Sequence, residues 1–191
     1  MRMFVAVRPP EPVLADLADY VEPRRDVDSP LRWSHPEQWH VTLAFLPSVT
    51  DRVLDDLVER LAETATGRPP FELQLAGAGA FPNPGRAKVL WAGVGGDTAA
   101  LTHLAGNLRS AAGRAGTHVD GGEFRPHVTL ARIGRPLDVT RWLRVFDLYA
   151  SASWQVTEVV LFHSRLGGGP ARYTEVKRFS LGRSTAEPAD R

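Results

Sequence analysis

A six-residue pattern occurs twice in the chain of 191 residues. The first copy is HVTLAF at residues 40–45, and the second is HVTLAR at residues 127–132, so five of six positions are identical. The copies are separated by nearly half the chain. That separation favours two related lobes over a solenoid of short repeats.

The pattern would place one imidazole beside one hydroxyl if each copy formed a β-strand. Side chains alternate between the two faces of a strand. His40 and Thr42 would share one face of the first strand, and His127 and Thr129 the same face of the second. An alanine follows on that face and leaves space for a ligand, while the valine and leucine point into a core.

Two such strands brought together would line a cleft with chemistry suited to a phosphodiester. Histidine has an ordinary pKa near 6.5, so one neutral imidazole can accept a proton while a protonated partner donates one. General acid–base catalysis of this kind contributes roughly 10²–10⁴ in rate. Thr42 and Thr129 can donate hydrogen bonds to the non-bridging oxygens, and Arg132 can offset the developing charge.

A structural interpretation and a metal site compete with this one. A single His-x-Thr is a weak signal, but two matched copies in the same apolar frame favour a functional site. Neither copy carries a second histidine or a carboxylate at metal-ligand spacing. The chain has no cysteine and no G-x-S-x-G segment, which argues against thiolate and serine nucleophiles. We therefore expect neither a metal nor a cofactor.

Four further residues are candidates for substrate binding. Phe124 and Trp33 could stack on a base, with core packing as the alternative. Arg125 could meet a second phosphate and Tyr173 could cap the cleft, although we favour a solvated arginine and hairpin packing. On an ideal strand Arg132 would face away from the catalytic side, so the strand must bend or end for it to reach the phosphate. The unmatched histidines are expected to be structural or exposed: His35, His103, His118 and His163.

Composition and charge restrict the kind of ligand. Hydrophobic residues make up 43% and charged residues 24%, which is typical of a globular protein. A net charge of +1 argues against tracking of a long phosphate backbone and favours contact with a few nucleotides at an end. We find no apolar stretch of about 20 residues and no signal-peptide core, so we expect a cytoplasmic protein without a membrane segment.

Helical and strand patterns interleave in the order β-α-β-α-β-β-α-β-β-β. This order predicts α/β or α+β layers. Thr50 and Asp97 are expected to cap helices. We expect residues 22–30 and 77–86 to form loops and the glycine-rich residues 167–170 to form a turn between the last two strands. We expect residues 1–182 to form a single domain of two lobes and residues 183–191 to be a flexible tail. The expected strands cover residues 3–7, 41–46, 71–76, 88–94, 128–133, 156–162 and 173–181.

The paired motif resembles the 2H phosphoesterase superfamily and, within it, the RNA 2′,3′-cyclic phosphodiesterases, historically called 2′-5′ RNA ligases. The resemblance runs roughly from Arg2 to Leu181. It departs from the family at Trp39, where smaller apolar residues are common, and at Arg8. The segments that carry it, besides the two copies, are MFVAVRP (3–9), RW (32–33), PEQW (36–39), GAFP (79–82), VLWAGV (89–94), FRP (124–126), SRL (164–166), Gly169 and Tyr173.

The resemblance implies a bilobal α+β fold, in which two pseudo-symmetric antiparallel sheets line a central cleft and helices lie outside. It implies hydrolysis of a 2′,3′-cyclic phosphate at an RNA 3′ end, or on a nucleotide, to a 2′-phosphomonoester. By analogy His40 is the general acid and His127 the general base, although the symmetric repeat leaves that order open. A 2′-5′ ligase acting on tRNA halves and a nucleotide-binding module without turnover are the alternatives. We expect a monomer.

Overall fold

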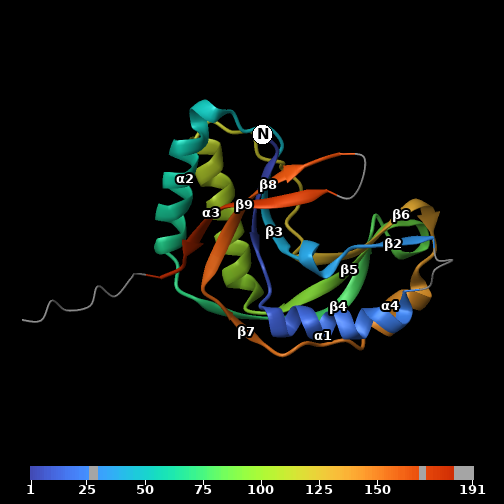
Figure 1. Ribbon diagram of the computed structural model, residues 1–191. Coiled ribbons are helices and arrows are strands. Elements are labelled where there is room, and N and C mark those ends of the chain that lie inside the picture. Colours follow the sequence, from blue (N-terminus) through green and yellow to red (C-terminus); the bar gives the residue numbers. More distant parts are fainter. Residues whose placement is uncertain (26–29, 168–170, 183–191) are drawn as a thin grey trace, which may run out of the picture.

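The computed structural model describes residues 1–25, 30–167 and 171–182 (Figure 1). The expected tail at 183–191 lies outside the described residues, as do parts of the expected loop at 22–30 and of the glycine-rich turn at 167–170. The helices and strands are β1 (Met3–Val7), α1 (Glu11–Val21), β2 (Leu31–Trp33), β3 (Val41–Leu46), α2 (Asp51–Thr66), β4 (Phe71–Phe81), β5 (Ala87–Gly96), α3 (Thr98–Arg114), β6 (His127–Leu137), α4 (Thr140–Phe146), β7 (Trp154–Val156), β8 (Glu158–Arg165) and β9 (Arg172–Ser180).

The predicted order of elements is confirmed, and three short elements are added to it: β2, α4 and β7. The two strands have three residues each and α4 has seven, which is too short for a period of two or 3.6 to stand out in a sequence. Asp97 caps α3 as predicted, because its carboxylate accepts a hydrogen bond from the backbone N–H of Ala100 at 2.9 Å. Thr50 precedes α2, but its hydroxyl makes no capping hydrogen bond.

The predicted loop at 77–86 is wrong over its first half, because β4 continues to Phe81. Gly77 has a φ of 73°, and the register with β5 shifts between Leu75 and Ala78. Gly79 lies directly under the indole of Trp91, where a Cβ would collide with the ring. The glycines therefore mark a bulge and a close approach inside a strand, not the end of the strand.

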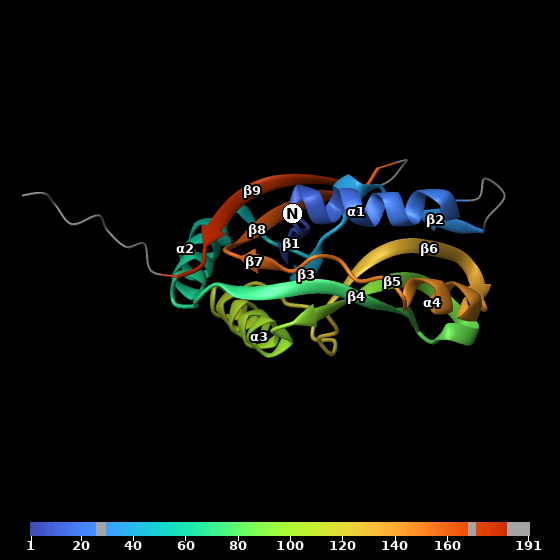
Figure 2. The same cartoon turned by 90° about the horizontal axis from the view of Figure 1, so that it is seen from below.

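The strands pair antiparallel in the order β7-β4-β5-β6-β3-β1-β8-β9, with β2 added on β6. The two halves of this order meet at β3 and β6, which share a single residue pair, Val41 opposite Val128. The predicted two antiparallel sheets are thus present and are continuous at one point. Helices α2 and α3 cover one end of the molecule and α1 and α4 lie at the other (Figures 1 and 2).

β1 is the most buried strand because it lies between β3 and β8 in the sheet. All five of its residues are buried. Met3, Val5 and Val7 face the main core, while Phe4 and Ala6 face a small second cluster on the other side. No helix in the described part of the chain is long and apolar enough to cross a membrane.

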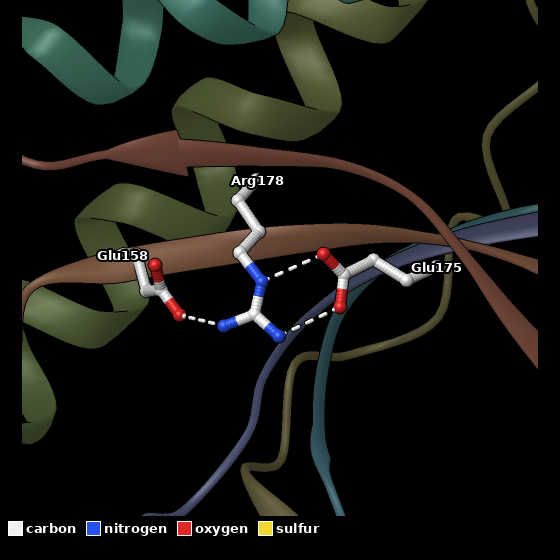
Figure 3. Close-up of polar contacts among 3 residues, drawn as sticks. All are labelled: Glu158, Glu175 and Arg178. Atoms are coloured by element: carbon white, nitrogen blue, oxygen red, sulfur yellow. Dashed lines mark hydrogen bonds and ion pairs between the residues drawn. The ribbon is translucent and has the colours of Figure 1, made fainter.

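Arg178 links β8 to β9 through two carboxylates (Figure 3). Its guanidinium donates to Glu158 at 2.6 Å and to both oxygens of Glu175 at 2.6 and 2.7 Å. A bidentate arginine shared by two acids is the geometry in which a surface ion pair contributes most. This network links β8 and β9, whose residues Ser164 and Tyr173 line the cleft described below.

The substitutions Gly79→Ala and Gly106→Ala should have opposite effects on stability. An added methyl at Gly79 collides with the indole of Trp91, so we expect the free energy of unfolding to fall by about 1–3 kcal/mol. Gly106 lies within α3 with nothing within 4 Å of its Cβ position, so alanine should raise stability by up to about 1 kcal/mol. Urea unfolding followed by far-UV circular dichroism measures both. Equal stability of the two variants would contradict the close approach at Gly79.

Candidate active site

The two copies of the repeat meet at the joint between the lobes. Val41 and Val128, each one residue after its histidine, are directly opposite one another. Because side chains alternate along a strand, both valines point into the core and the flanking residues point to the other side. A cleft of about 800 Å³ opens there, and its described lining includes His40, Thr42, His127 and Thr129.

Each copy contains a bulge at its leucine. Partners of β1 pass from Thr42 to Ala44, and partners of β5 pass from Thr129 to Ala131, so Leu43 and Leu130 are the extra residues. In both copies the leucine and the following alanine are buried in succession, which reverses the alternation.

The bulge in the second copy moves Arg132 onto the face of His127. An ideal strand would place Arg132 on the opposite face, and the structure supplies the bend that the sequence required. Arg132 lines the cleft as a result.

The imidazoles are held in the same way. Nδ1 of His40 lies 2.6 Å from the carbonyl oxygen of Gln38, and Nδ1 of His127 lies 2.6 Å from that of Arg125. A carbonyl oxygen only accepts hydrogen bonds, so Nδ1 carries the hydrogen in each ring. Nε2 is therefore the atom available to exchange a proton with a ligand.

Aromatic rings surround both imidazoles. The ring of His40 stacks on Phe4 at a centroid distance of 4.6 Å and meets Tyr173 edge-on at 5.3 Å. The ring of His127 meets Phe81 edge-on at 5.0 Å. These contacts restrict each ring to one orientation and remove much of its surface from water.

Burial dominates the electrostatics of both histidines. It lowers the pKa of His40 from 6.5 to about 4, against the opposing effect of the Gln38 carbonyl. Burial also lowers the pKa of His127, and the positive charge of Arg132 lowers it further. Both imidazoles are therefore neutral at pH 7 in the free protein.

The described lining of the cleft carries three guanidinium groups. Besides Arg132, its described lining includes Arg2 and Arg32, which sequence reasoning missed. The guanidinium of Arg2 lies over the ring of Phe45, 4.7 Å from its centroid. Phe45 is the residue that replaces arginine in the first copy of the repeat, so Arg2 supplies a cation on that side. Arg2 is two residues before Phe4, so an extended chain would place both side chains on the same face. This spacing was the sequence signal that could have identified Arg2 as a residue of the cleft.

The described lining of the cleft contains no aspartate or glutamate. The hydroxyls of Thr42 and Thr129 form no hydrogen bond with any residue that the structure describes. Within residues 1–25, 30–167 and 171–182, no group of three or more His, Asp or Glu side chains is placed to hold a metal ion. The cleft thus offers free hydroxyl donors and positive charge, which suits an anion.

Trp33 and Tyr173 line the cleft, whereas Phe124 and Arg125 are absent from its described lining. Trp33 also packs on Trp142 at a centroid distance of 5.5 Å, so it joins core and cleft.

Phe124 is partly buried against the core, and Arg109 lies 5.4 Å from its ring centroid. The side chain of Arg125 pairs with Glu123 at 2.8 Å, and only its carbonyl serves the site. Base stacking by Phe124 and phosphate binding by Arg125 therefore have no geometric support in the cleft.

His35 is exposed, as expected, and it also lines the cleft, which the sequence did not indicate. A short 3-10 helix (Pro36–Gln38) separates it from β3, so strand alternation does not apply between His35 and His40. Gln38 in this turn has two roles. Its carbonyl orients His40, and its side-chain amide donates to the carbonyl of Ala171 at 2.8 Å.

Comparison with known proteins agrees with this geometry. Residues 9–168 match the family model of the 2′-5′ RNA ligase superfamily. The RNA 2′,3′-cyclic phosphodiesterase of Aeropyrum pernix is 36% identical over 160 residues, which cover 81% of this chain and 90% of that protein.

Solved structures share the fold. The crystal structure of Escherichia coli LigT in apo form has a TM-score of 0.77 and 28% identity, covering 95% of this chain and 98% of LigT. LigT complexed with 3′-AMP has a TM-score of 0.78 and 28% identity, covering 94% of this chain and 97% of LigT. These matches confirm the predicted bilobal fold, and the chain belongs to the 2′-5′ RNA ligase superfamily.

Proposed function

We propose that the protein hydrolyses 2′,3′-cyclic phosphates at RNA 3′ ends to 2′-phosphomonoesters, with His40 and His127 as its acid and base. The observation that carries the proposal is the convergence of two His-x-Thr segments on one cleft that has positive charge. Relatives named RNA 2′,3′-cyclic phosphodiesterase support the substrate class. Because both lobes contribute to the cleft, we infer that residues 1–182 act as one unit.

In this mechanism the cyclic phosphorus lies between the two imidazoles. Nε2 of His127 takes a proton from water, and the water oxygen forms a bond to phosphorus. The bound anion stabilises the imidazolium form of His40, so that its Nε2 carries a proton. The bond from phosphorus to O3′ breaks, and Nε2 of His40 gives this proton to O3′. The product keeps the phosphate on O2′, and the two histidines end with their protonation states exchanged.

The remaining polar groups act on the charge of the phosphate. Thr42 and Thr129 donate hydrogen bonds to the two non-bridging oxygens, one from each copy of the repeat. Arg132 and Arg2 offset the negative charge that grows as water attacks. We propose that these protein groups suffice for the reaction, so turnover should persist in the presence of a chelator.

Removal of either imidazole should strongly reduce turnover. We expect His40→Ala and His127→Ala each to lower kcat by about 10²–10⁴ on a short RNA ending in a 2′,3′-cyclic phosphate, in buffer with EDTA. Chromatography of the products measures hydrolysis and any ligated RNA together. His103→Ala, on the exposed side of α3, is the control and should keep full activity. Full activity of either active-site variant would refute the proposal, and tight binding without turnover by the wild type would favour a binding module.

The titration of His40 should respond to a bound anion. In the free protein its NMR titration midpoint is expected near 4, because burial disfavours the imidazolium. Uridine 2′-phosphate should raise this midpoint, since a nearby negative charge stabilises the imidazolium. A midpoint at the ordinary value in the free protein would contradict the burial of this ring.

The same shift has a consequence for stability. Below pH 6.5 the unfolded chain takes up a proton at position 40 before the folded chain does, so the free energy of unfolding should decrease as the pH falls from 6.5 toward 4. This decrease should be smaller in His40→Gln, as urea unfolding at several pH values can measure.

Arg2 should contribute to turnover although it lies outside both copies of the repeat. We expect Arg2→Gln to lower kcat/KM by about tenfold, less than the 10²–10³ lost with a fully enclosed oxyanion donor, because Arg2 is exposed to solvent. Arg2→Lys should recover part of the loss. Arg52→Gln, an exposed position on α2, controls for net charge. Equal kcat/KM for Arg2→Gln and Arg52→Gln would remove Arg2 from the site.

A further inference from the structure

Two arginines face each other across neighbouring strands in the cleft. Arg32 of β2 is directly opposite Arg132 of β6, between the pairs Leu31–Ile133 and Trp33–Ala131. Directly opposite residues of an antiparallel pair point to the same face, and both arginines are exposed and line the cleft. Like charges in this position destabilise a sheet.

Nothing in the described chain offsets this repulsion. Neither guanidinium forms an ion pair with a described residue, and the described cleft lining holds no carboxylate. Arg178 is a useful contrast within the same protein, because two glutamates neutralise it (Figure 3). Within the described chain, the pair formed by Arg32 and Arg132 is therefore available to bind the negative charge of a ligand.

The two guanidinium groups serve different positions along the cleft. Arg132 lowers the pKa of both histidines, so its charge acts at the reacting phosphate. Nη2 of Arg32 lies 3.8 Å from the Cβ position of Gly134, two residues further along β6. With a strand rise of about 3.3 Å per residue, Arg32 extends the positive charge by roughly one nucleotide step away from His127.

We propose that Arg32 binds the phosphodiester on the 5′ side of the terminal nucleotide, so that the preferred substrate is an oligonucleotide end and not a free nucleoside 2′,3′-cyclic phosphate. The inference rests on the proposed function, since it takes the cyclic phosphate to lie at the histidines. The cleft of about 800 Å³ lies toward the upper end of the usual range for ligand pockets and has room for more than one nucleotide. The near-neutral net charge agrees with contact limited to this short segment.

The test compares two dinucleotide substrates that differ by one charge. Both are adenylyl-uridine with a 2′,3′-cyclic phosphate, one with a natural internal phosphodiester and the other with an uncharged methylphosphonate in its place. Wild-type protein should favour the charged linkage by about fivefold in kcat/KM, the factor for a strong ion pair exposed to solvent. Arg32→Gln should reduce this preference to about one. The slope of log kcat/KM against log salt should also become shallower by about 0.7.

Arg144→Gln is the matched control, because Arg144 is exposed in the same lobe and does not line the cleft. It should keep the preference of the wild type. Retention of the preference by Arg32→Gln, or its loss in Arg144→Gln, would overturn the inference.

Binding separates this inference from the proposed reaction. Calorimetry with the two dinucleotides as 2′-phosphates should give the same fivefold ratio in Kd, and Arg32→Gln should remove it. If the wild type cleaves neither cyclic substrate, the proposed reaction fails while the binding ratio still decides the role of Arg32. Equal Kd values for the two linkages in the wild type would refute the subsite.

Discussion

The pairing of Val41 with Val128 is the contact on which the site depends. In the described chain, Val41 and Val128 are the only residues of β3 and β6 that pair across the sheet, and this pairing joins the two halves of the sheet. Because each valine follows a histidine and precedes a threonine, one buried contact brings four polar side chains to the same cleft. The lobes can then differ in their helices and loops without moving the reacting groups apart.

The bulges and aromatic rings around this contact adjust the two copies for chemistry. A bulge at Leu43 and another at Leu130 change which residues face the cleft, and the second admits Arg132. Aromatic neighbours hold the rings and remove water, which keeps both imidazoles neutral in the free protein. A cleft without described carboxylates then makes binding of an anion the event that favours protonation.

The two copies of the repeat differ at their last residue, and we propose that this difference contributes to the preference for an oligonucleotide end. The first copy ends in Phe45, which supports Arg2, and the second ends in Arg132, which faces Arg32. The histidines and threonines of the two copies flank the phosphorus on both sides, while the arginines distribute positive charge unevenly along the cleft. This uneven charge agrees with the proposed binding of a directional RNA end.

Hydrophobic spacing along the chain predicted the order of the longer elements, because strand alternation and helical spacing act over neighbouring residues. The repeat predicted that its two histidines and two threonines share one cleft and that the strand bends before Arg132, while the fold family was predicted from the resemblance to the 2H phosphoesterases. Only the tertiary structure showed that the cleft is also lined by Arg2, Arg32 and His35. It also showed that Phe124 and Arg125 are absent from the described lining. These residues are placed by cross-strand register and by a short turn, which join distant parts of the chain and leave no period in the sequence.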